Sequence, residues 1–268
     1  MDKSFQYQNA TISYKVHGTG MPVMLLHGFA EDHTIWEKQV DELRKLYQVI
    51  IPDLPGSGKS DLLEGADVGM ETYADCIDAL LLGEKVDSLV MLGHSMGGYI
   101  TLAFAERFPA KLKGFGFVHS TAFEDTDEKK ANRRKGIKMI EEYGAFSFIK
   151  NTTPNLFSET FKREKPAEVN AIIEAGREFS TSALTQYYQA MLNRPDRKHV
   201  IEQSRKPVLF MAGTEDIAAP LDDILQQAHL PRVSYIHIIK NVGHMGMVEA
   251  PGEVNKHLLH FFDLCEPA

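Results

Sequence analysis

Short apolar runs alternate with amphipathic segments in two parts of this chain, and this alternation limits its fold more than any other feature. Runs such as PVMLLHG (22–28) and SLVMLGHS (88–95) are mostly apolar, which suits strands buried on both faces of a parallel sheet. Segments between them, such as 34–47, space their apolar residues three and four apart, as amphipathic helices do. In that segment the apolar positions are Ile35, Trp36, Val40, Leu43 and Leu46. The alternation predicts an α/β fold, with helices on both faces of a mostly parallel sheet.

The middle of the chain breaks this pattern. The segment 121–204 reads as several helices without a convincing buried strand, and the strand–helix alternation resumes after it. We therefore expect residues 1–120 and 205–268 to form one core domain, with 121–204 as a helical cap. At the start of the chain, an alternating polar and apolar stretch indicates two strands joined by a turn at Asn9–Ala10.

Length and charge exclude several classes of protein. A chain of 268 residues fits one large domain or a domain with an insertion. Its net charge of −8 gives no basic footprint for nucleic acid. No apolar run approaches the roughly 20 residues that span a bilayer, and the first residues show no secretory signal. Two distant cysteines make no disulfide framework. We expect a cytoplasmic protein that binds neither nucleic acid nor membrane.

The strongest chemical motif is Gly-His-Ser-Met-Gly at 93–97, which matches G-x-S-x-G. The pattern alone is common, but here it lies between a buried strand and a helix, where a nucleophile elbow forms. Glycine is needed on both sides because the turn is too tight for a side chain. The turn would hold the Ser95 hydroxyl clear of the sheet at the positive end of a helix. Ser95 is therefore the candidate nucleophile.

A serine nucleophile needs a base, and the base needs an acid to orient it. In this architecture the acid and the histidine follow the serine in that order, each after a later strand. The segment after the strand at 207–213 offers Glu215 and Asp216, and the segment after the next strand offers His244. Both segments lie at the carboxyl ends of strands, where α/β proteins build their sites.

Two backbone N–H groups are expected to stabilise the oxyanion of the transition state. One is that of Met96, which follows the candidate nucleophile. The other is that of Phe29, in the loop after the strand at 22–28. His27, beside Phe29, is expected to brace this loop rather than to transfer protons.

A competing interpretation rests on Gly58-Lys59-Ser60, which matches the end of a phosphate-binding P-loop. That motif requires a glycine five positions before Gly58, and the residue there is Asp53. Pro55 also removes one of the backbone N–H donors that would hold a phosphate. We expect Asp53 to be structural and to bond loop backbone, with Lys59 as a surface cation.

These motifs together resemble the α/β-hydrolase superfamily, specifically its capped single-domain serine esterase-like branch. The resemblance runs from about residue 22 to the C-terminus. It implies an eight-stranded, mostly parallel sheet with the cap inserted after the sixth strand. It also implies that Asp216, rather than Glu215, is the acid. The motifs that carry it are HGF (27–29), D-x-x-G-x-G-x-S (53–60), GHSMGG (93–98), GTED (213–216) and GH-x4-E-x-P (243–251).

The resemblance implies a serine hydrolase that cleaves a carboxylic ester or related acyl compound through Ser95, His244 and Asp216. We expect no cofactor and no metal. The expected partner is a small-molecule acyl substrate, and the protein is expected to be a monomer or homodimer. A C–C bond hydrolase, lactonase, thioesterase, cofactor-free perhydrolase or hydrolase-like small-molecule receptor stays open as an alternative. Two or three of the aromatic residues at 146–188 are expected to face the substrate. The candidates are Phe146, Phe148, Phe157, Phe161, Phe179, Tyr187 and Tyr188.

Overall fold

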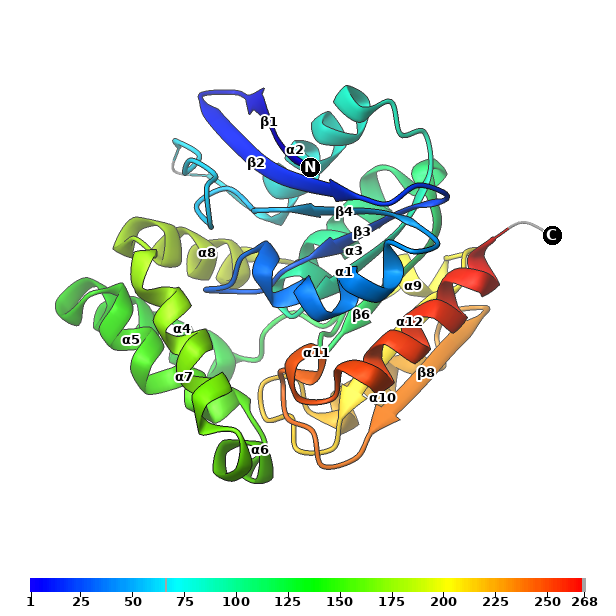
Figure 1. Cartoon of the computed structure of the whole chain (residues 1–268). Coiled ribbons are helices and arrows are strands. Elements are labelled where there is room, and N and C mark those ends of the chain that lie inside the picture. The colour runs from blue at the N-terminus through cyan, green and yellow to red at the C-terminus, as the bar shows by residue number, and fades with distance from the viewer. Residues whose placement is uncertain (66, 267–268) are drawn as a thin grey trace.

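The computed structural model of the chain describes residues 1–65 and 67–266, and within them eight strands form one sheet (Figure 1). Its strand order is β1-β2-β4-β3-β5-β6-β7-β8. The first two pairings, β1 with β2 and β2 with β4, are antiparallel, and all others are parallel. The predicted eight-stranded, mostly parallel sheet is confirmed. The strands are β1 (Asp2–Tyr7), β2 (Ala10–His17), β3 (Pro22–Leu26), β4 (Gln48–Pro52), β5 (Leu89–His94), β6 (Leu112–Val118), β7 (Val208–Gly213) and β8 (Ser234–Ile239).

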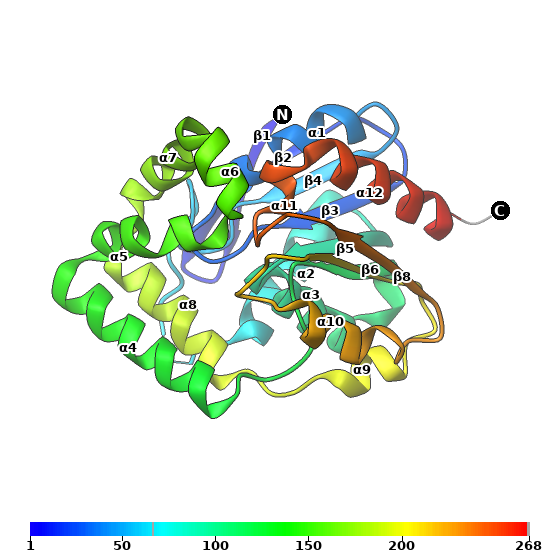
Figure 2. The ribbon, with the colours of Figure 1, turned by 90° about the horizontal axis from the view of Figure 1, so that it is seen from below.

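Helices cover both faces of this sheet, and each face has its own apolar core (Figure 2). The helices α2, α3 and α10 pack on one face, while α1 and α12 pack on the other. The inner strands β5 and β7 are buried at every position, which explains their continuous apolar sequences. These helices are α1 (Glu37–Leu43), α2 (Met70–Glu84), α3 (Met96–Arg107), α10 (Leu221–Ala228) and α12 (Pro251–Cys265).

The chain between β6 and β7 is helical, as its sequence predicts. Helices α4 to α8 lie together beside the sheet in both views (Figures 1 and 2). The last helix of this segment, α9, packs instead against α3 of the core. The end of the 121–204 segment therefore lies on the core and not with helices α4 to α8. Residues 66 and 267–268, which belong to the expected core ranges, lie outside the described residues. The helices are α4 (Asp127–Tyr143), α5 (Ala145–Thr152), α6 (Glu159–Glu164), α7 (Pro166–Ala175), α8 (Thr181–Asn193) and α9 (Lys198–Glu202).

Two local expectations are corrected. The helix predicted over 34–47 is a short 3-10 turn followed by α1, which ends at Leu43. Leu46, expected on its apolar face, is 62% exposed. The neighbouring Tyr47 is buried instead, packs edge-on against Phe262 and donates a hydrogen bond from its hydroxyl to a carboxylate on α12. The first hairpin turns at residues 8–9 rather than 9–10, because Ala10 already pairs within the sheet.

The P-loop-like segment is held by Asp53, whose carboxylate is buried. It accepts hydrogen bonds from the backbone N–H groups of His33 (3.0 Å) and Lys59 (3.1 Å), and lies 2.6 Å from the His33 ring. Gly58 has a φ of +52°, and a Cβ at that position would lie 2.4 Å from the Asp53 carboxyl carbon. The expected structural role of Asp53 is confirmed, because its carboxylate bonds the backbone of the loop.

A buried charge cluster joins the ends of the helical segment. The Asp125 side chain is fully buried between β6 and α4 and accepts hydrogen bonds from Arg133 and Arg194. The Arg194 contact measures 2.9 Å, and the same guanidinium lies 3.8 Å from the centre of the Tyr99 ring on α3. The cluster therefore connects two cap helices with the helix that follows Ser95.

Replacing Asp125 by alanine is expected to lower the free energy of unfolding by about 3 kcal/mol or more. The substitution leaves two largely buried guanidinium groups without their counter-charge. Urea denaturation followed by circular dichroism measures the loss. The control is Glu124→Ala, which removes an exposed pairing with Lys130 and should cost less than about 1 kcal/mol. Equal losses in the two variants would contradict this interpretation.

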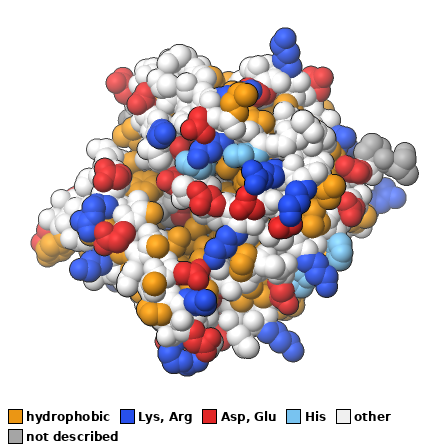
Figure 3. Space-filling view, in the orientation of Figure 1, with side chains coloured by type: hydrophobic (Ala, Val, Ile, Leu, Met, Phe, Trp, Pro, Cys, Tyr) orange, Lys and Arg blue, Asp and Glu red, His pale blue; other side chains and the backbone are white. Residues whose placement is uncertain are grey.

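The surface carries mixed charge. On the face shown in Figure 3, Lys and Arg side chains are interspersed with Asp and Glu, without a continuous basic patch. Across residues 1–65 and 67–266, none of the helices combines the length and apolar character that a membrane span requires.

Candidate active site

Ser95 lies in a sharp turn between β5 and α3. It is a non-glycine residue with a positive φ of 48°, a strained conformation that its neighbours maintain. Its carbonyl oxygen accepts a hydrogen bond from the Ser120 hydroxyl at 2.7 Å. A Cβ on Gly93 would lie 2.1 Å from the backbone of Gly97, so the turn requires glycine there. The structure therefore has the elbow geometry that the sequence predicts.

Asp216 and His244 come together from the loops after β7 and β8. The Nδ1 atom of His244 lies 3.0 Å and 2.9 Å from the two carboxylate oxygens of Asp216. Both residues are buried, whereas Glu215 is exposed. The structure thus pairs His244 with Asp216 and not with the adjacent glutamate. With Nδ1 bonded to the carboxylate, Nε2 is the ring nitrogen left for another partner.

The pair strongly favours its charged form. Burial favours the neutral form of Asp216, but attraction to His244 and hydrogen bonds from His119 and His244 hold its pKa well below the usual range. Burial would likewise lower the pKa of His244, yet the attraction and hydrogen bond of Asp216 outweigh it and raise that pKa. The site therefore stabilises an imidazolium at His244.

His119, which sequence reasoning did not select, shares the same carboxylate. Its Nδ1 lies 3.1 Å from Asp216 Oδ2, and its ring is fully buried. It has a positive φ of 52°, and burial lowers its pKa. Its Nε2 has no hydrogen-bond partner within the described part of the chain. The sequence signal available was its place directly after the sixth strand.

The expected oxyanion donors lie against the elbow. A Cβ on Gly28 would lie 3.2 Å from the Ser95 Cβ, and one on Gly97 would lie 2.6 Å from the carbonyl oxygen of His27. The loop after β3 is therefore in direct contact with the start of α3. In residues 1–65 and 67–266, neither the backbone N–H of Phe29 nor that of Met96 has a hydrogen-bond acceptor.

His27 braces this loop, as the sequence predicts. Its Nε2 accepts a hydrogen bond from the backbone N–H of Leu54 at 2.9 Å, which leaves the ring proton on Nδ1. Nδ1 then donates to the carbonyl oxygen of Gly28, also at 2.9 Å. Both ring nitrogens are committed to backbone groups, so His27 ties the Phe29 loop to the loop after β4.

Aromatic residues of the cap cover the Phe29 loop. The Phe29 ring stacks on Tyr188 with a centroid separation of 4.4 Å. Phe148 and Tyr187 meet the same ring edge-on at 6.3 Å. Of the other candidates, Phe157 and Phe161 stack on each other at 5.5 Å, away from this group. That two or three cap aromatics face the substrate remains a prediction.

The cap also bonds directly to the segment that carries His244. The backbone N–H of His244 donates to the carbonyl oxygen of Leu156 at 2.7 Å. The Glu249 carboxylate accepts from the backbone N–H groups of Gly243 and Ser158, each at 3.0 Å. Leu156 and Ser158 belong to the connection between α5 and α6, so this part of the cap fixes the position of the histidine loop.

Two groups of side chains have the spacing of metal ligands. One consists of Asp32, His33 and Asp53, and the other of His119, Asp216 and His244; in each, the ligand atoms lie within 4.8 Å of one another. In the second group both histidines direct Nδ1 at the Asp216 carboxylate. A ring nitrogen that donates a proton offers no lone pair to a cation, so hydrogen bonding accounts for this grouping.

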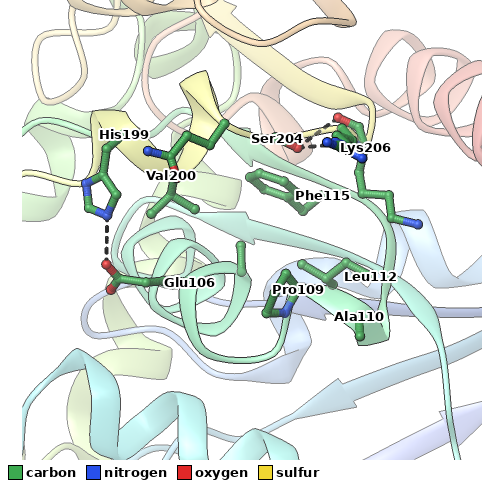
Figure 4. Close-up of a pocket in the computed structure, with 12 residues that line it drawn as sticks. Glu106, Pro109, Ala110, Leu112, Phe115, His199, Val200, Ser204 and Lys206 are labelled. Atoms are coloured by element: carbon green, nitrogen blue, oxygen red, sulfur yellow. Dashed lines mark hydrogen bonds and ion pairs between the residues drawn. The ribbon is translucent and has the colours of Figure 1, made fainter.

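A cavity of about 500 Å³ lies apart from these residues, between α3, β6 and α9 (Figure 4). Phe115 and Leu112 form part of its apolar lining. On its rim, Glu106 accepts a hydrogen bond from His199 at 2.9 Å. None of Ser95, Asp216 and His244 lines it, so its volume gives no measure of the candidate active site.

Comparisons with known proteins agree with this fold. A family model described as the alpha/beta hydrolase fold matches residues 21–251. Lipase 1 of Psychrobacter immobilis is 28% identical, over 99% of this chain and 82% of its own length. The 2-hydroxy-6-oxo-2,4-heptadienoate hydrolase of Pseudomonas putida is 25% identical, over 87% and 85%. The solved structure of a thermophilic esterase from Thermogutta terrifontis matches with a TM-score of 0.93 at 26% identity, covering 100% of both chains. This chain therefore belongs to the α/β-hydrolase family.

Proposed function

We propose that the protein is a serine hydrolase that cleaves small-molecule carboxylic esters. The observation that carries this proposal is the buried contact of His244 with both oxygens of Asp216. The His244 ring centre lies 4.7 Å from that of His94, the residue before Ser95. A histidine held by a carboxylate is the arrangement that activates a serine for acyl transfer. The similarity to a lipase and to a structurally determined esterase supports ester chemistry.

In the proposed reaction the Ser95 hydroxyl attacks the ester carbonyl carbon while Nε2 of His244 takes its proton. The negative charge that develops on the carbonyl oxygen is stabilised by the N–H groups of Phe29 and Met96. His244 then gives the proton to the departing alcohol, leaving an acyl group on Ser95. Water, deprotonated by the same histidine, attacks the acyl carbon and releases the acid and the free serine.

A substrate panel tests this proposal. Initial rates on short and long acyl esters, lactones and thioesters, with Ser95→Ala as the control, should show turnover highest on esters. Preferential turnover of a vinylogous 1,5-diketone, with little ester cleavage, would instead favour a C–C bond hydrolase. The similarity to the heptadienoate hydrolase makes that the second candidate. No Ser95-dependent turnover of any of these compounds would overturn the proposal.

A covalent probe tests the nucleophile separately from substrate choice. A fluorophosphonate is attacked by an activated serine and remains attached to it. Intact mass and peptide mapping should place a single adduct on Ser95. Equal labelling of the wild type and Ser95→Ala would show that another residue reacts.

The pH dependence of kcat/KM follows from the state of His244. Only the neutral imidazole can accept the Ser95 proton, so activity is lost as the pH falls through the pKa of His244 in the folded protein. Asp216 raises that pKa above the ordinary value of 6.5. We therefore expect the acid limb of a kcat/KM profile, measured from about pH 5 to pH 9, to have its midpoint above 6.5. A midpoint clearly below 6.5 would contradict this role for the pair.

A further inference from the structure

Glu31 is a buried acid at the centre of the candidate site, although the proposed reaction does not use it. It lies in the loop after β3, and its side chain is only 6% exposed. Burial favours its neutral form, but the attraction and hydrogen bond of His94, together with the N–H of Gly28, lower its pKa. An ionised carboxylate in this position requires donors, and the structure provides two of them.

One oxygen of Glu31 contacts two separate segments of the site. Its Oε2 accepts the backbone N–H of Gly28 at 2.6 Å and lies 2.9 Å from Nδ1 of His94. Gly28 immediately precedes Phe29, and His94 immediately precedes Ser95. The shared atom thus fixes the distance between the loop of one expected oxyanion donor and the turn that carries the other.

The His94 ring extends this connection to the base. Its Nε2 lies 3.0 Å from the carbonyl oxygen of His244. The His94 ring is fully buried, and its centre lies 4.7 Å from that of His244. A single chain of contacts therefore runs from the Phe29 loop, through Glu31 and His94, to the His244 loop.

The packing at this point leaves no room for a side chain at residue 28. A Cβ on Gly28 would lie 2.9 Å from the His94 ring, 3.0 Å from the Glu31 carboxylate and 3.2 Å from the Ser95 Cβ. Glu31, His94 and Ser95 therefore pack closely around Gly28. Displacement of the Glu31 carboxylate would free Gly28 and His94 to move independently, and transition-state stabilisation is sensitive to shifts of about 1 Å.

We infer that Glu31 is a positioning residue, which holds the Phe29 and Met96 N–H groups in register with each other and with His244. This inference rests on the proposed serine hydrolase function. Glu31 touches no reacting atom; it acts through Gly28 and His94. Its loss should therefore affect the transition state, in which the oxyanion forms, more than the binding of the ground-state ester.

The test is a comparison of kcat and KM on the best ester substrate, per mole of folded protein. Glu31→Ala should lower kcat by about 10²-fold with KM within about threefold of the wild type. Glu31→Asp keeps the charge but shortens its reach, and should still lower kcat at least about tenfold. Glu31→Gln keeps the length of the side chain and an oxygen that can accept hydrogen bonds, but not the charge. Its kcat should be about tenfold higher than that of Glu31→Ala.

The matched control is Glu84→Ala. Glu84 lies on α2, is 12% exposed at its side chain, and accepts hydrogen bonds from Lys3 and Tyr14. Its removal should lower the melting temperature and leave kcat within about twofold of the wild type, as expected for a group outside the site. It shows what the loss of a partly buried, hydrogen-bonded acid does through stability alone.

The inference is overturned if folded Glu31→Ala or Glu31→Asp retains kcat within about threefold of the wild type, or if a rise in KM accounts for the whole loss. Should Glu31→Ala fail to fold, Glu31→Asp decides the matter. Failure of the proposed function looks different, because Ser95→Ala would then retain wild-type turnover. Activity that depends on Ser95 but not on Glu31 refutes this inference alone.

Discussion

Replacing Ser95 by alanine should reduce kcat on esters by on the order of 10⁶-fold, because the proposed reaction loses the atom that forms the acyl intermediate. The elbow itself should survive, since alanine meets the same backbone strain as serine at a φ of 48°. Steady-state kinetics and the melting temperature of the same preparation separate the two effects.

The control for this variant is Ser4→Ala, which removes an exposed hydroxyl from β1 and should leave kcat unchanged. A folded Ser95→Ala protein with more than about 1% of wild-type turnover would be incompatible with nucleophilic catalysis by this residue. Contaminating host esterase is excluded by preparing both variants in parallel.

Replacing Asp216 by asparagine is the second large effect, with an expected fall in kcat of about 10⁴-fold. Asparagine can present its N–H₂ group to Nδ1 of His244, which would leave the ring proton on Nε2, where it blocks acceptance of the serine proton. Asparagine also loses the charge that stabilises the imidazolium.

Glu215→Gln is the matched variant for this measurement, because it makes the same chemical change one residue away. Glu215 is exposed, and its substitution should change kcat by less than about twofold. From residue type alone, Glu215 and Asp216 were both candidates for the acid that orients His244. A larger loss in Glu215→Gln than in Asp216→Asn would reverse the assignment.

The parts of the fold that could be predicted are those set by short-range patterns. Alternation of apolar strands with amphipathic helices predicted the sheet and its two helical layers. The glycines around Ser95 predicted a tight turn, because no side chain fits at Gly93. Chain order predicted that an acid at 215–216 and His244 would meet, since the carboxyl ends of parallel strands lie at one edge of the sheet. The choice of Asp216 over Glu215 came from the family resemblance.

The parts that could not be predicted depend on contacts between distant segments. Glu31 and His94 lie 63 residues apart, and nothing local in the sequence of either indicates their hydrogen bond. His119 reaches Asp216 across 97 residues in the same way. Leu46 is exposed, against expectation, because α1 ends at Leu43, a boundary that apolar spacing alone does not determine.

The bonds between the cap and the His244 loop limit how a substrate can enter. The Leu156 carbonyl holds the His244 N–H, and Ser158 shares the Glu249 carboxylate with Gly243. A cap that swung open as one rigid lid would therefore pull His244 away from its position beside Asp216. Substrate entry that leaves this corner in place would keep His244 aligned with Asp216.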